Sequence, residues 1–317
     1  MTGPTASGKT ELLDSIFGRG AFSFFASIGK IRPDDENLPS AAAVISADSM
    51  QAYRGMDIGT AKPESDLLDR LPHHLIDIKN PDEQYTAGEF VRLADALCFS
   101  LAAKNVVPVI SGGTGFYIRS FVCGAGTAPP SDPAVRKEVA GDLERLGPET
   151  LRRELADTDP ASAARINERD LYRLTRAVEI LRMSGRPPSC FAPSSEPRSG
   201  YEFLILGVER PRDELKTRIH ARVEKMFETG LADEVDALKS AGYTAESPGL
   251  KAIGYSEFFS MEGEPREDIA EAIELHTNQY MKRQMTFLRA LPGIRWMEAD
   301  PGLFSRTVIS FLSDSRR

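Results

Sequence analysis

A short segment near the start of the chain has residue types and spacing suited to binding phosphate. It matches the pattern G-x-x-x-x-G-K-[ST] and consists of Gly3, Pro4, Thr5, Ala6, Ser7, Gly8, Lys9 and Thr10. The two glycines lack a Cβ, so the backbone can bend sharply and approach an anion with its N–H groups. The positive end of the helix that follows adds to this attraction. We expect Lys9 to reach terminal phosphate oxygens and the Thr10 hydroxyl to hold Mg²⁺. A chance turn of Gly and Ser is the alternative.

The position of this loop in the chain is unusual. A phosphate-binding loop of this kind ordinarily follows a buried β-strand, but only Met1 and Thr2 precede Gly3. Either the true start lies upstream of Met1 and supplies the first strand, or the sheet lacks that strand. We favour an upstream start. Mass spectrometry of the natural protein's N-terminus tests this expectation, and a natural protein that begins at Met1 would contradict it.

Asp48 follows a predicted strand and is the first candidate for proton transfer. The apolar run Ala43–Ser46 has the pattern of a buried parallel strand. Ligands of open α/β sheets bind beyond the carboxyl ends of the strands. We therefore expect Asp48 to be a general base beside the phosphate loop. A helix cap and an outer-shell ligand of Mg²⁺ are the alternatives.

The end of the next predicted central strand, Val106–Ile110, carries a hydroxyl and no acid. P-loop ATPases place a carboxylate after a second core strand, so its absence weighs against ATP hydrolysis. Thr114 follows this strand after two glycines. Its hydroxyl can donate to a phosphate or a leaving group, or it can cap the helix predicted over 116–123.

Arginines form two further groups. Arg218 and Arg222 lie one turn apart on a helix predicted over 212–228, where a guanidinium can bind phosphate oxygens through two hydrogen bonds. Ion pairs with Glu214 or Glu224 are the alternative. A basic stripe in the middle of the chain suggests a polyanionic partner. The alternative is a solvated helix face whose arginines pair with nearby acids, and the pattern alone favours this alternative. The stripe consists of Arg165, Arg169, Arg173, Arg176, Arg182 and Arg186, with Arg136, Lys137, Arg152 and Arg153.

The elements that must position these residues alternate between strand and helix in the first third of the chain. Strands are predicted at 43–46, 74–78 and 106–110, and helices at 9–17, 86–103 and 116–123. Only helices are predicted next, at 133–146, 148–156, 159–166 and 170–183. The sheet resumes at 203–208, followed by helices at 212–228, 230–241 and 265–289 and an edge strand at 294–297. Alternation of this kind implies a parallel sheet with helices on its faces.

We therefore predict an α/β fold, a P-loop NTPase-like parallel sheet flanked by helices, with an inserted all-helical subdomain. Residues 1–128 and 200–317 form the predicted catalytic core, and 129–199 form the insert with a Pro/Ser-rich exit linker. Residues 18–42 are interpreted as an insertion whose role is packing.

Composition limits the class of protein. The chain has 317 residues, 41% hydrophobic and 27% charged, which is ordinary for a soluble globular enzyme. No stretch reaches membrane-spanning length and no signal pattern is present, so we expect a cytoplasmic protein. Three scattered cysteines exclude a disulfide framework and a zinc site. The net charge of −8 argues mildly against a nucleic-acid binder.

Taken together, the motifs resemble the tRNA dimethylallyltransferase family. The match runs in order along nearly the whole chain except 18–42. It comprises Gly3–Thr10, Ala47–Pro63, Gly112–Gly115, Lys251–Tyr255 and Thr277–Gln284. The resemblance implies a bacterial-type enzyme that transfers a dimethylallyl group from dimethylallyl diphosphate to N6 of an adenosine. That adenosine lies next to the anticodon of tRNAs that read codons beginning with U.

The resemblance also implies a role for each matched residue. Gly3–Thr10 would hold the isoprenoid diphosphate rather than ATP, with Mg²⁺ on Thr10. Asp48, Thr114 and Arg222 would be catalytic: the general base, a residue at the reaction centre and the arginine on the diphosphate. The implied tRNA contacts are Asp48, Ser49, Met50, Gln51, Thr114, Arg136, Tyr172, Arg173, Leu174, Thr175, Arg176, Lys251, Ala252, Ile253, Gly254, Tyr255 and Ser256. Asn278 and Ser256 depart from the pattern, since many relatives carry a basic residue there.

The expected partners are the anticodon stem-loop of tRNA and dimethylallyl diphosphate, bound by a monomer with no membrane contact. Adenine N6 is a weak nucleophile and needs a base, whereas pyrophosphate leaves with growing negative charge. Two other functions remain open from the sequence. A P-loop small-molecule kinase would use ATP and no tRNA, and an RNA-binding module would leave the tRNA chemically unchanged.

Overall fold

The computed structural model describes residues 1–18 and 41–314 of the chain. They belong to two compact units, one formed by Met1–Val122 and Ser199–Arg317 and the other by Cys123–Arg198. The helical unit thus starts at Cys123 and ends at Arg198, whereas we predicted 129–199. The predicted insertion at 18–42 lies almost entirely outside the described residues.

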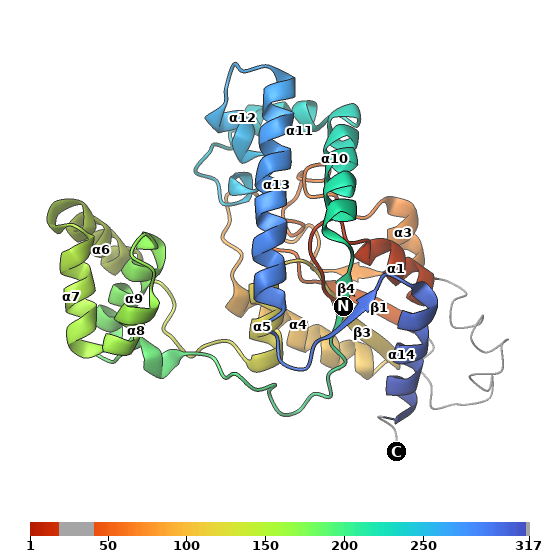
Figure 1. Ribbon diagram of the computed structural model, residues 1–317, viewed down its shortest axis with the longest axis horizontal. Helices are drawn as coiled ribbons and strands as arrows, with labels where there is room; N and C mark the ends of the chain where they lie inside the picture. Colours follow the sequence, from red (N-terminus) through yellow and green to blue (C-terminus); the bar gives the residue numbers. More distant parts are fainter. Residues whose placement is uncertain (19–40, 315–317) are drawn as a thin grey trace. The chain divides into compact units, whose positions relative to one another are not determined.

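The first unit is built on parallel strands (Figure 1). Strands β1 (Ala41–Ser46), β2 (His73–His74) and β3 (Val106–Ser111) form one sheet in the order β2-β1-β3, and β4 (Leu206–Glu209) pairs with β5 (Arg295–Glu298). Thr2 forms parallel bridges to both Gly112 and Gly207, so it lies between the two sheets. The predicted parallel α/β architecture is confirmed, in two pieces that meet at Thr2.

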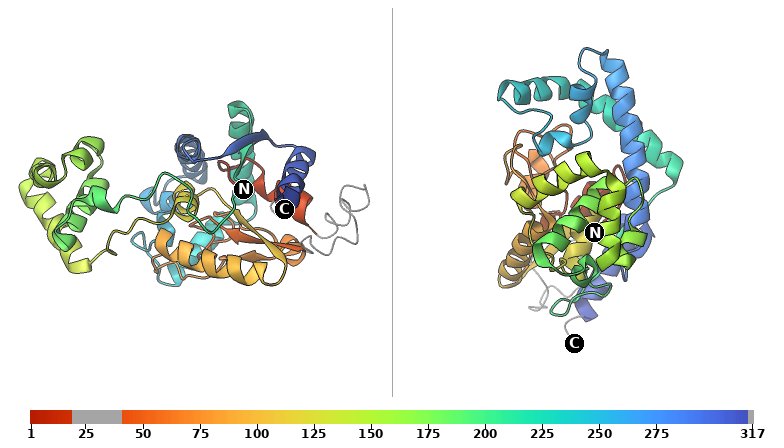
Figure 2. Two further views of the ribbon diagram at one scale, coloured as in Figure 1. Left: turned by 90° about the horizontal axis from the view of Figure 1, so that it is seen from below. Right: turned by 90° about the vertical axis from the view of Figure 1, so that its left-hand side faces the viewer.

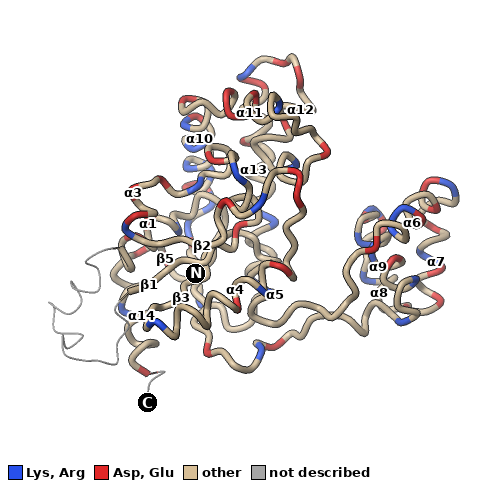
Figure 3. Tube along the Cα trace, turned by 180° about the vertical axis from the view of Figure 1, so that it is seen from behind, with Lys and Arg blue, Asp and Glu red and all other residues tan. Residues whose placement is uncertain are grey.

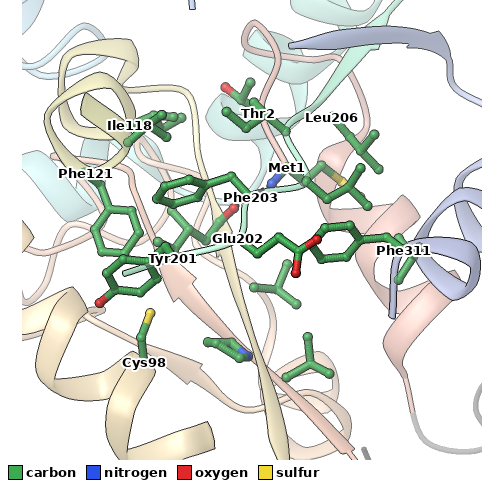
Figure 4. Close-up of a pocket in the computed structure, with 18 of the residues that line it drawn as sticks. Met1, Thr2, Cys98, Ile118, Phe121, Tyr201, Glu202, Phe203, Leu206 and Phe311 are labelled. Atoms are coloured by element: carbon green, nitrogen blue, oxygen red, sulfur yellow. Dashed lines mark hydrogen bonds between the residues drawn. The ribbon is translucent and has the colours of Figure 1, made fainter. Parts of the chain in front are cut away.

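An apolar cavity of about 190 Å³ lies beside Thr2, between β3 and the segment that leads into β4 (Figure 4). The rings of Phe121 and Tyr201 meet edge to face at 5.4 Å, and Tyr201 stacks on Phe203 at 5.5 Å. The ammonium of Met1 donates to the Ile110 carbonyl at 2.7 Å. None of the residues proposed from the sequence to do chemistry lines this cavity.

Helices cover both faces of the sheet (Figure 2). Side chains of α1 (Lys9–Phe17), α3 (Ser65–Arg70) and α14 (Pro301–Asp314) pack with Val44 of β1 in one core. Successive side chains of a strand point to opposite faces, so Ile45, which has no exposed surface, faces the other side. Helix α4 (Ala87–Ala102) contacts β3 and β1, and α5 (Gly115–Cys123) follows β3. The two-sided burial explains why β1 is apolar at nearly every position.

Helices α10 (Arg212–Glu228) and α13 (Arg266–Leu288) lie side by side in the first unit (Figure 1). Leu215 and Ile219 of α10 pack against Met281 of α13, and Ala6 of the phosphate loop packs on this cluster. Helices α11 (Leu231–Ser240) and α12 (Ser256–Ser260) and the short turn η2 (Gly249–Lys251) complete this side. The phosphate loop is therefore fixed between the sheet and the α10–α13 pair.

The second unit consists of short helices around a small core of its own. They are α6 (Pro133–Leu146), α7 (Pro148–Thr158), α8 (Pro160–Arg165), α9 (Leu171–Ser184) and η1 (Pro188–Phe191). Asp132, Asp159 and Asp170 accept hydrogen bonds from the first-turn N–H groups of α6, α8 and α9, as N-cap residues do. Asp170 therefore starts a new helix, and the predicted basic stripe is divided among the helices α6 to α9 and the turns that follow α8 and α9.

The structure corrects several element predictions. The strand predicted over 74–78 pairs only at His73–His74, because Leu75 and Asp77 adopt positive φ values of 64° and 55°. Helices α3, α12 and α14 were not predicted. None of the helices in residues 1–18 and 41–314 is long and apolar enough to cross a bilayer.

Candidate active site

The phosphate loop has the bent backbone that the sequence predicts. Ala6 and Gly8 have φ values of 60° and 86°, and α1 begins at the next residue, Lys9. The Lys9 ammonium donates to the carbonyls of Gly3 at 2.9 Å and Pro4 at 2.8 Å. Burial lowers the pKa of Lys9 to about 8, while the nearby charge of Asp48 opposes the shift. The Lys9 ammonium thus lies across the phosphate loop. When a phosphate binds, its oxygens can replace the two carbonyls as hydrogen-bond partners of Lys9.

Three guanidinium groups from the β4–α10 region approach the same loop. Arg210 donates to the Ser7 carbonyl at 2.8 Å and Arg218 to the Ala6 carbonyl at 2.7 Å, and both also pair with acids: Arg210 with Glu214 and Arg218 with Glu11. Arg222 lies 3.3 Å from the Thr5 hydroxyl. Burial lowers the pKa of Arg222, and Asp48 opposes this shift. No ion pair among the described residues includes Arg222.

Asp48 and Thr114 come together at the ends of β1 and β3. One oxygen of Asp48, Oδ1, accepts the Met50 N–H at 3.0 Å. The Thr114 hydroxyl accepts the Ser49 N–H at 2.9 Å and donates to the Ser49 hydroxyl at 3.2 Å. The charge of Asp48 acts on both Lys9 and Arg222, so its carboxylate lies near both cations. The structure therefore places Asp48 and the Thr114–Ser49 contact close to the phosphate loop, which Arg222 reaches at Thr5.

Helix α13 supplies two residues that we did not place in the site from the sequence. Gln284, only 6% exposed, accepts the Thr5 N–H at 2.8 Å and donates to the Gly113 carbonyl at 2.8 Å. It thereby ties the phosphate loop to the loop that carries Thr114. Burial raises the pKa of Tyr280 to about 12, Asp48 adds to the shift, and hydrogen bonds with Gln284 and Thr114 oppose it. The sequence did carry a signal for these two residues: Tyr280 and Gln284 are polar and lie one turn apart on the same face of a predicted helix.

The side chain of Gln51 is occupied within the fold. Its amide oxygen accepts from the Ser46 hydroxyl at 3.1 Å, and its amide nitrogen donates to the Ala61 carbonyl at 3.1 Å. Ser49 and Met50 lie in the same turn, between Asp48 and Gln51, and are partly exposed. These residues directly follow Asp48, and their contact with a nucleotide remains a prediction.

The residues expected to contact tRNA on the second unit differ in exposure. Arg136 and Arg173 are exposed, and Tyr172 is 71% exposed. Leu174 has no exposed surface and packs in the core of the unit, so its side chain cannot contact an RNA. Thr175 is partly exposed and its hydroxyl donates to the Tyr172 carbonyl.

Ion pairs within the helical unit use part of the predicted basic stripe. Arg176 pairs with Glu179 at 2.9 Å, and Arg182 pairs with three acids, Glu138, Asp142 and Glu154. Lys and Arg segments alternate with Asp and Glu segments along these helices (Figure 3). Arg173 also pairs with Asp170 at 3.1 Å, but its side chain is 74% exposed, against 29% for Arg176 and 21% for Arg182. Arg136 and Arg173 are thus more accessible to a polyanion than Arg176 or Arg182.

Half of the segment Lys251–Ser256 is buried. Lys251 and Ser256 keep exposed or partly exposed side chains, and Ile253 is partly exposed, whereas Ala252 and Gly254 are buried. Tyr255 has no exposed surface and donates to Glu234 at 2.6 Å. A side-chain contact of Tyr255 with tRNA, which the resemblance implied, is therefore incompatible with its place in the fold.

A magnesium ion bound mainly by diphosphate fits the residues at the phosphate loop. Thr10 lies exposed on the first turn of α1, next to Lys9, and offers a hydroxyl oxygen. Residues 1–18 and 41–314 contain no group of three or more His, Cys, Asp or Glu side chains able to hold a metal. Mg²⁺ is commonly held by few protein oxygens together with substrate phosphates and water, so Thr10 suits this kind of site.

The lowered pKa of Lys9 predicts a pH dependence for anion binding. Above pH about 8 the amine of the free protein loses its proton, whereas a bound diphosphate favours the charged form. We expect the affinity for inorganic pyrophosphate to be highest below pH 8 and to fall about tenfold per pH unit above it. Calorimetry from pH 7 to 9.5 checks this, in buffers of different ionisation enthalpy.

A Lys9→Arg variant is the control, because a guanidinium stays charged across this range while the ionisation of pyrophosphate itself is the same for both proteins. The difference between the two pH profiles isolates Lys9. Parallel profiles would show that Lys9 does not titrate in this window.

Comparisons with known proteins find relatives of the chain along nearly all of its length. The family model described as IPP transferase matches residues 51–291. The tRNA dimethylallyltransferase of Geobacter sulfurreducens is 39% identical over 94% of this chain and 90% of its own length. The tRNA dimethylallyltransferase 1 of Citrifermentans bemidjiense is 39% identical over 99% of this chain and 96% of its own.

Two solved structures are similar as well. The full-length tRNA isopentenylpyrophosphate transferase of Bacillus halodurans aligns with a TM-score of 0.63 at 30% identity, over 99% of this chain and 94% of its own. A eukaryotic dimethylallyltransferase solved acting on tRNA aligns with a TM-score of 0.75 at 23% identity, over 100% of this chain and 79% of its own, and supports the fold. The family model covers most of the chain and the relatives match along nearly all of it, so the chain belongs to the IPP transferase family.

Proposed function

We propose that this protein transfers a dimethylallyl group from dimethylallyl diphosphate to N6 of the adenosine next to the anticodon of tRNA. The observation that carries the proposal is the set of contacts around the phosphate loop: Arg222 reaches Thr5, and Gln284 joins Thr5 to Gly113 beside Thr114 and Asp48. A carboxylate that can take a proton thus lies beside cations that can hold a diphosphate. The relatives named tRNA dimethylallyltransferase support the same substrates.

In the proposed reaction, a C–N bond forms between adenine N6 and the first carbon of the allylic group. The bond between that carbon and the diphosphate oxygen breaks, and pyrophosphate leaves with the bonding electrons. Asp48 accepts the proton that N6 releases. Its Oδ1 stays bonded to the Met50 N–H, so the carboxylate keeps a fixed orientation while Oδ2 receives the proton.

The phosphate loop and its cations stabilise the leaving group. Negative charge grows on pyrophosphate in the transition state, where positioned N–H groups and cations lower its energy. Lys9 exchanges its carbonyl partners for phosphate oxygens, and Arg222 is directed to the loop at Thr5. Mg²⁺, held through Thr10, would add further charge neutralisation when bound. Gln284 keeps the phosphate loop and the Thr114 loop at a fixed separation.

The target adenine must leave its stack to reach Asp48 and the diphosphate, as expected for an enzyme that acts on a base in a single-stranded loop. We propose that exposed Arg136, Tyr172 and Arg173 of the helical unit bind the RNA. A guanidinium suits phosphate, and an exposed aromatic ring suits stacking on a base. The protein would act in the cytoplasm as a monomer.

One assay separates this function from its alternatives. The protein is incubated with dimethylallyl diphosphate, Mg²⁺ and tRNA. The tRNA is then digested to nucleosides, whose masses are measured by mass spectrometry. We expect adenosine that carries one dimethylallyl group. Binding of tRNA without a change in mass would indicate an RNA-binding module. Transfer of phosphate from ATP to a small molecule without tRNA would indicate a kinase.

The exposed Arg173 gives a prediction for RNA binding. Arg173→Ala removes one cation, so the affinity for tRNA falls and the slope of log K against log salt decreases by about 0.7 to 0.9. Fluorescence anisotropy with labelled tRNA at several salt concentrations measures the slope. Arg173→Lys keeps the charge and should keep the slope. An unchanged slope for Arg173→Ala would mean that Arg173 does not contact the tRNA backbone.

A further inference from the structure

Glu234, on the first turn of α11, makes an unusual set of contacts with a loop far away in sequence. Its carboxylate accepts three consecutive N–H groups, those of Asp57 at 2.8 Å, Ile58 at 2.9 Å and Gly59 at 3.2 Å. The Tyr255 hydroxyl donates to it at 2.6 Å. A charged acceptor gives stronger hydrogen bonds than a neutral one, so this single side chain fixes the N–H side of the loop formed by residues 57–61.

The ring of Tyr255 packs against the same loop at Gly59. A Cβ on Gly59 would lie 2.4 Å from the ring, so only glycine fits at this position. Burial and the charge of Glu234 raise the pKa of Tyr255, so its phenol stays protonated and donates. Ala61, at the other end of the loop, has a φ of 47°, a conformation that a residue other than glycine adopts only where its surroundings impose it.

The opposite side of the 57–61 loop faces the candidate active site. The Thr60 carbonyl lies 3.5 Å from Arg222 and 3.4 Å from the amide nitrogen of Gln51, and the Ala61 carbonyl accepts from Gln51 at 3.1 Å. Because the N–H groups of the loop are held by Glu234, these carbonyls are directed to Arg222 and Gln51. The loop thus connects α11 to two residues of the site.

We propose that Glu234 is a positioning residue, which sets the place of the Arg222 guanidinium and of the Gln51 side chain through the 57–61 loop. It does not touch substrate itself. The proposal rests on the proposed function in one respect, the binding of diphosphate by Arg222. It predicts that substitution of Glu234 weakens diphosphate binding and slows the transfer, while the affinity for tRNA is unchanged.

Glu234→Gln is the central variant. It keeps the length of the side chain but presents an NH₂ group to N–H donors, so the loop must shift. We expect the affinity for inorganic pyrophosphate with Mg²⁺ to fall about tenfold, as for a binding group moved by less than 1 Å. The kcat should fall as well, whereas the affinity for tRNA should stay within about twofold, because that binding depends mainly on phosphate contacts. Tyr255→Phe removes one of the four hydrogen bonds and should give a smaller loss of the same kind.

Asp236→Asn is the matched control, since Asp236 is an exposed acid on the same helix. It removes the same charge and should leave pyrophosphate binding unchanged. A double variant of Glu234→Gln with Arg222→Gln separates positioning from a general loss of stability. If Glu234 acts through Arg222, the double variant loses no more pyrophosphate affinity than Arg222→Gln alone.

The two proposals fail in different ways. Losses that add in the double variant, or unchanged pyrophosphate affinity in Glu234→Gln, would overturn the positioning role of Glu234. If the unchanged protein binds no pyrophosphate, the proposed diphosphate site itself is wrong, whatever the variants do.

Discussion

Asp48→Asn is expected to bind tRNA and pyrophosphate normally and to lose nearly all transfer activity. The amide keeps an oxygen for the Met50 N–H, which Oδ1 of Asp48 accepts at 3.0 Å, so the turn after β1 should remain. It cannot accept the proton from adenine N6. A general base contributes about 10²- to 10⁴-fold to a rate, and a loss of this size in kcat is the expected result.

Single-turnover measurements with tRNA and dimethylallyl diphosphate check the prediction, because they separate the chemical step from product release. Asp82→Asn is a suitable control, since Asp82 is an exposed acid in a turn of the same unit. A loss in Asp48→Asn that appears only in KM would mean that the carboxylate binds substrate and does not take its proton. An unchanged rate would remove Asp48 from the chemistry.

Much of the fold followed from local signals in the sequence. The helices that start at Pro133 and Leu171 are preceded by Asp132 and Asp170, which cap them as Asp commonly does. Strands β1 and β3 are apolar runs of a length typical of buried strands. The strand predicted over 74–78 was wrong because its apolar residues belong to a turn in which Leu75 and Asp77 have positive φ. Pattern alone does not report such a turn.

The site was less accessible to sequence reasoning, because its contacts join distant segments. Lys9 was found because it belongs to a recognisable motif, and Asp48 because it follows the end of a predicted strand. Gln284 contacts Thr5 across 279 positions, and no spacing rule predicts such a pair. The burial of Leu174 and Tyr255 likewise depends on packing, so a motif that includes them cannot separate residues that touch RNA from residues that support their neighbours.

Ion pairs with Glu214 or Glu224 were the alternative role for Arg218 and Arg222. Neither arginine makes such a pair: Glu214 pairs with Arg210, just before α10, and Arg218 pairs with Glu11 of α1. Arg210 and Arg218 each also donate to a carbonyl of the phosphate loop. Their positive charge is thus largely compensated, and their hydrogen bonds hold the loop in shape. Arg222 takes part in none of the ion pairs found in the described parts of the chain, and its burial lowers its pKa. A partly buried cation without a paired acid is stabilised when an anion binds.

Arg222→Gln should therefore lose far more activity than Arg218→Gln, although the two residues lie one turn apart on α10. Removing the guanidinium that receives the diphosphate is expected to lower kcat/KM about 10²- to 10³-fold, as loss of a group that stabilises developing charge does. Arg218→Gln breaks an exposed pair with Glu11, worth about 1 kcal/mol or less, and one hydrogen bond to the loop. It should cost less than about tenfold in kcat/KM and a small decrease in Tm. Steady-state kinetics with varied dimethylallyl diphosphate, together with thermal unfolding of both variants, measures the contrast. Equal losses in the two variants would mean that both arginines act only by shaping the loop, and that the diphosphate is held without Arg222.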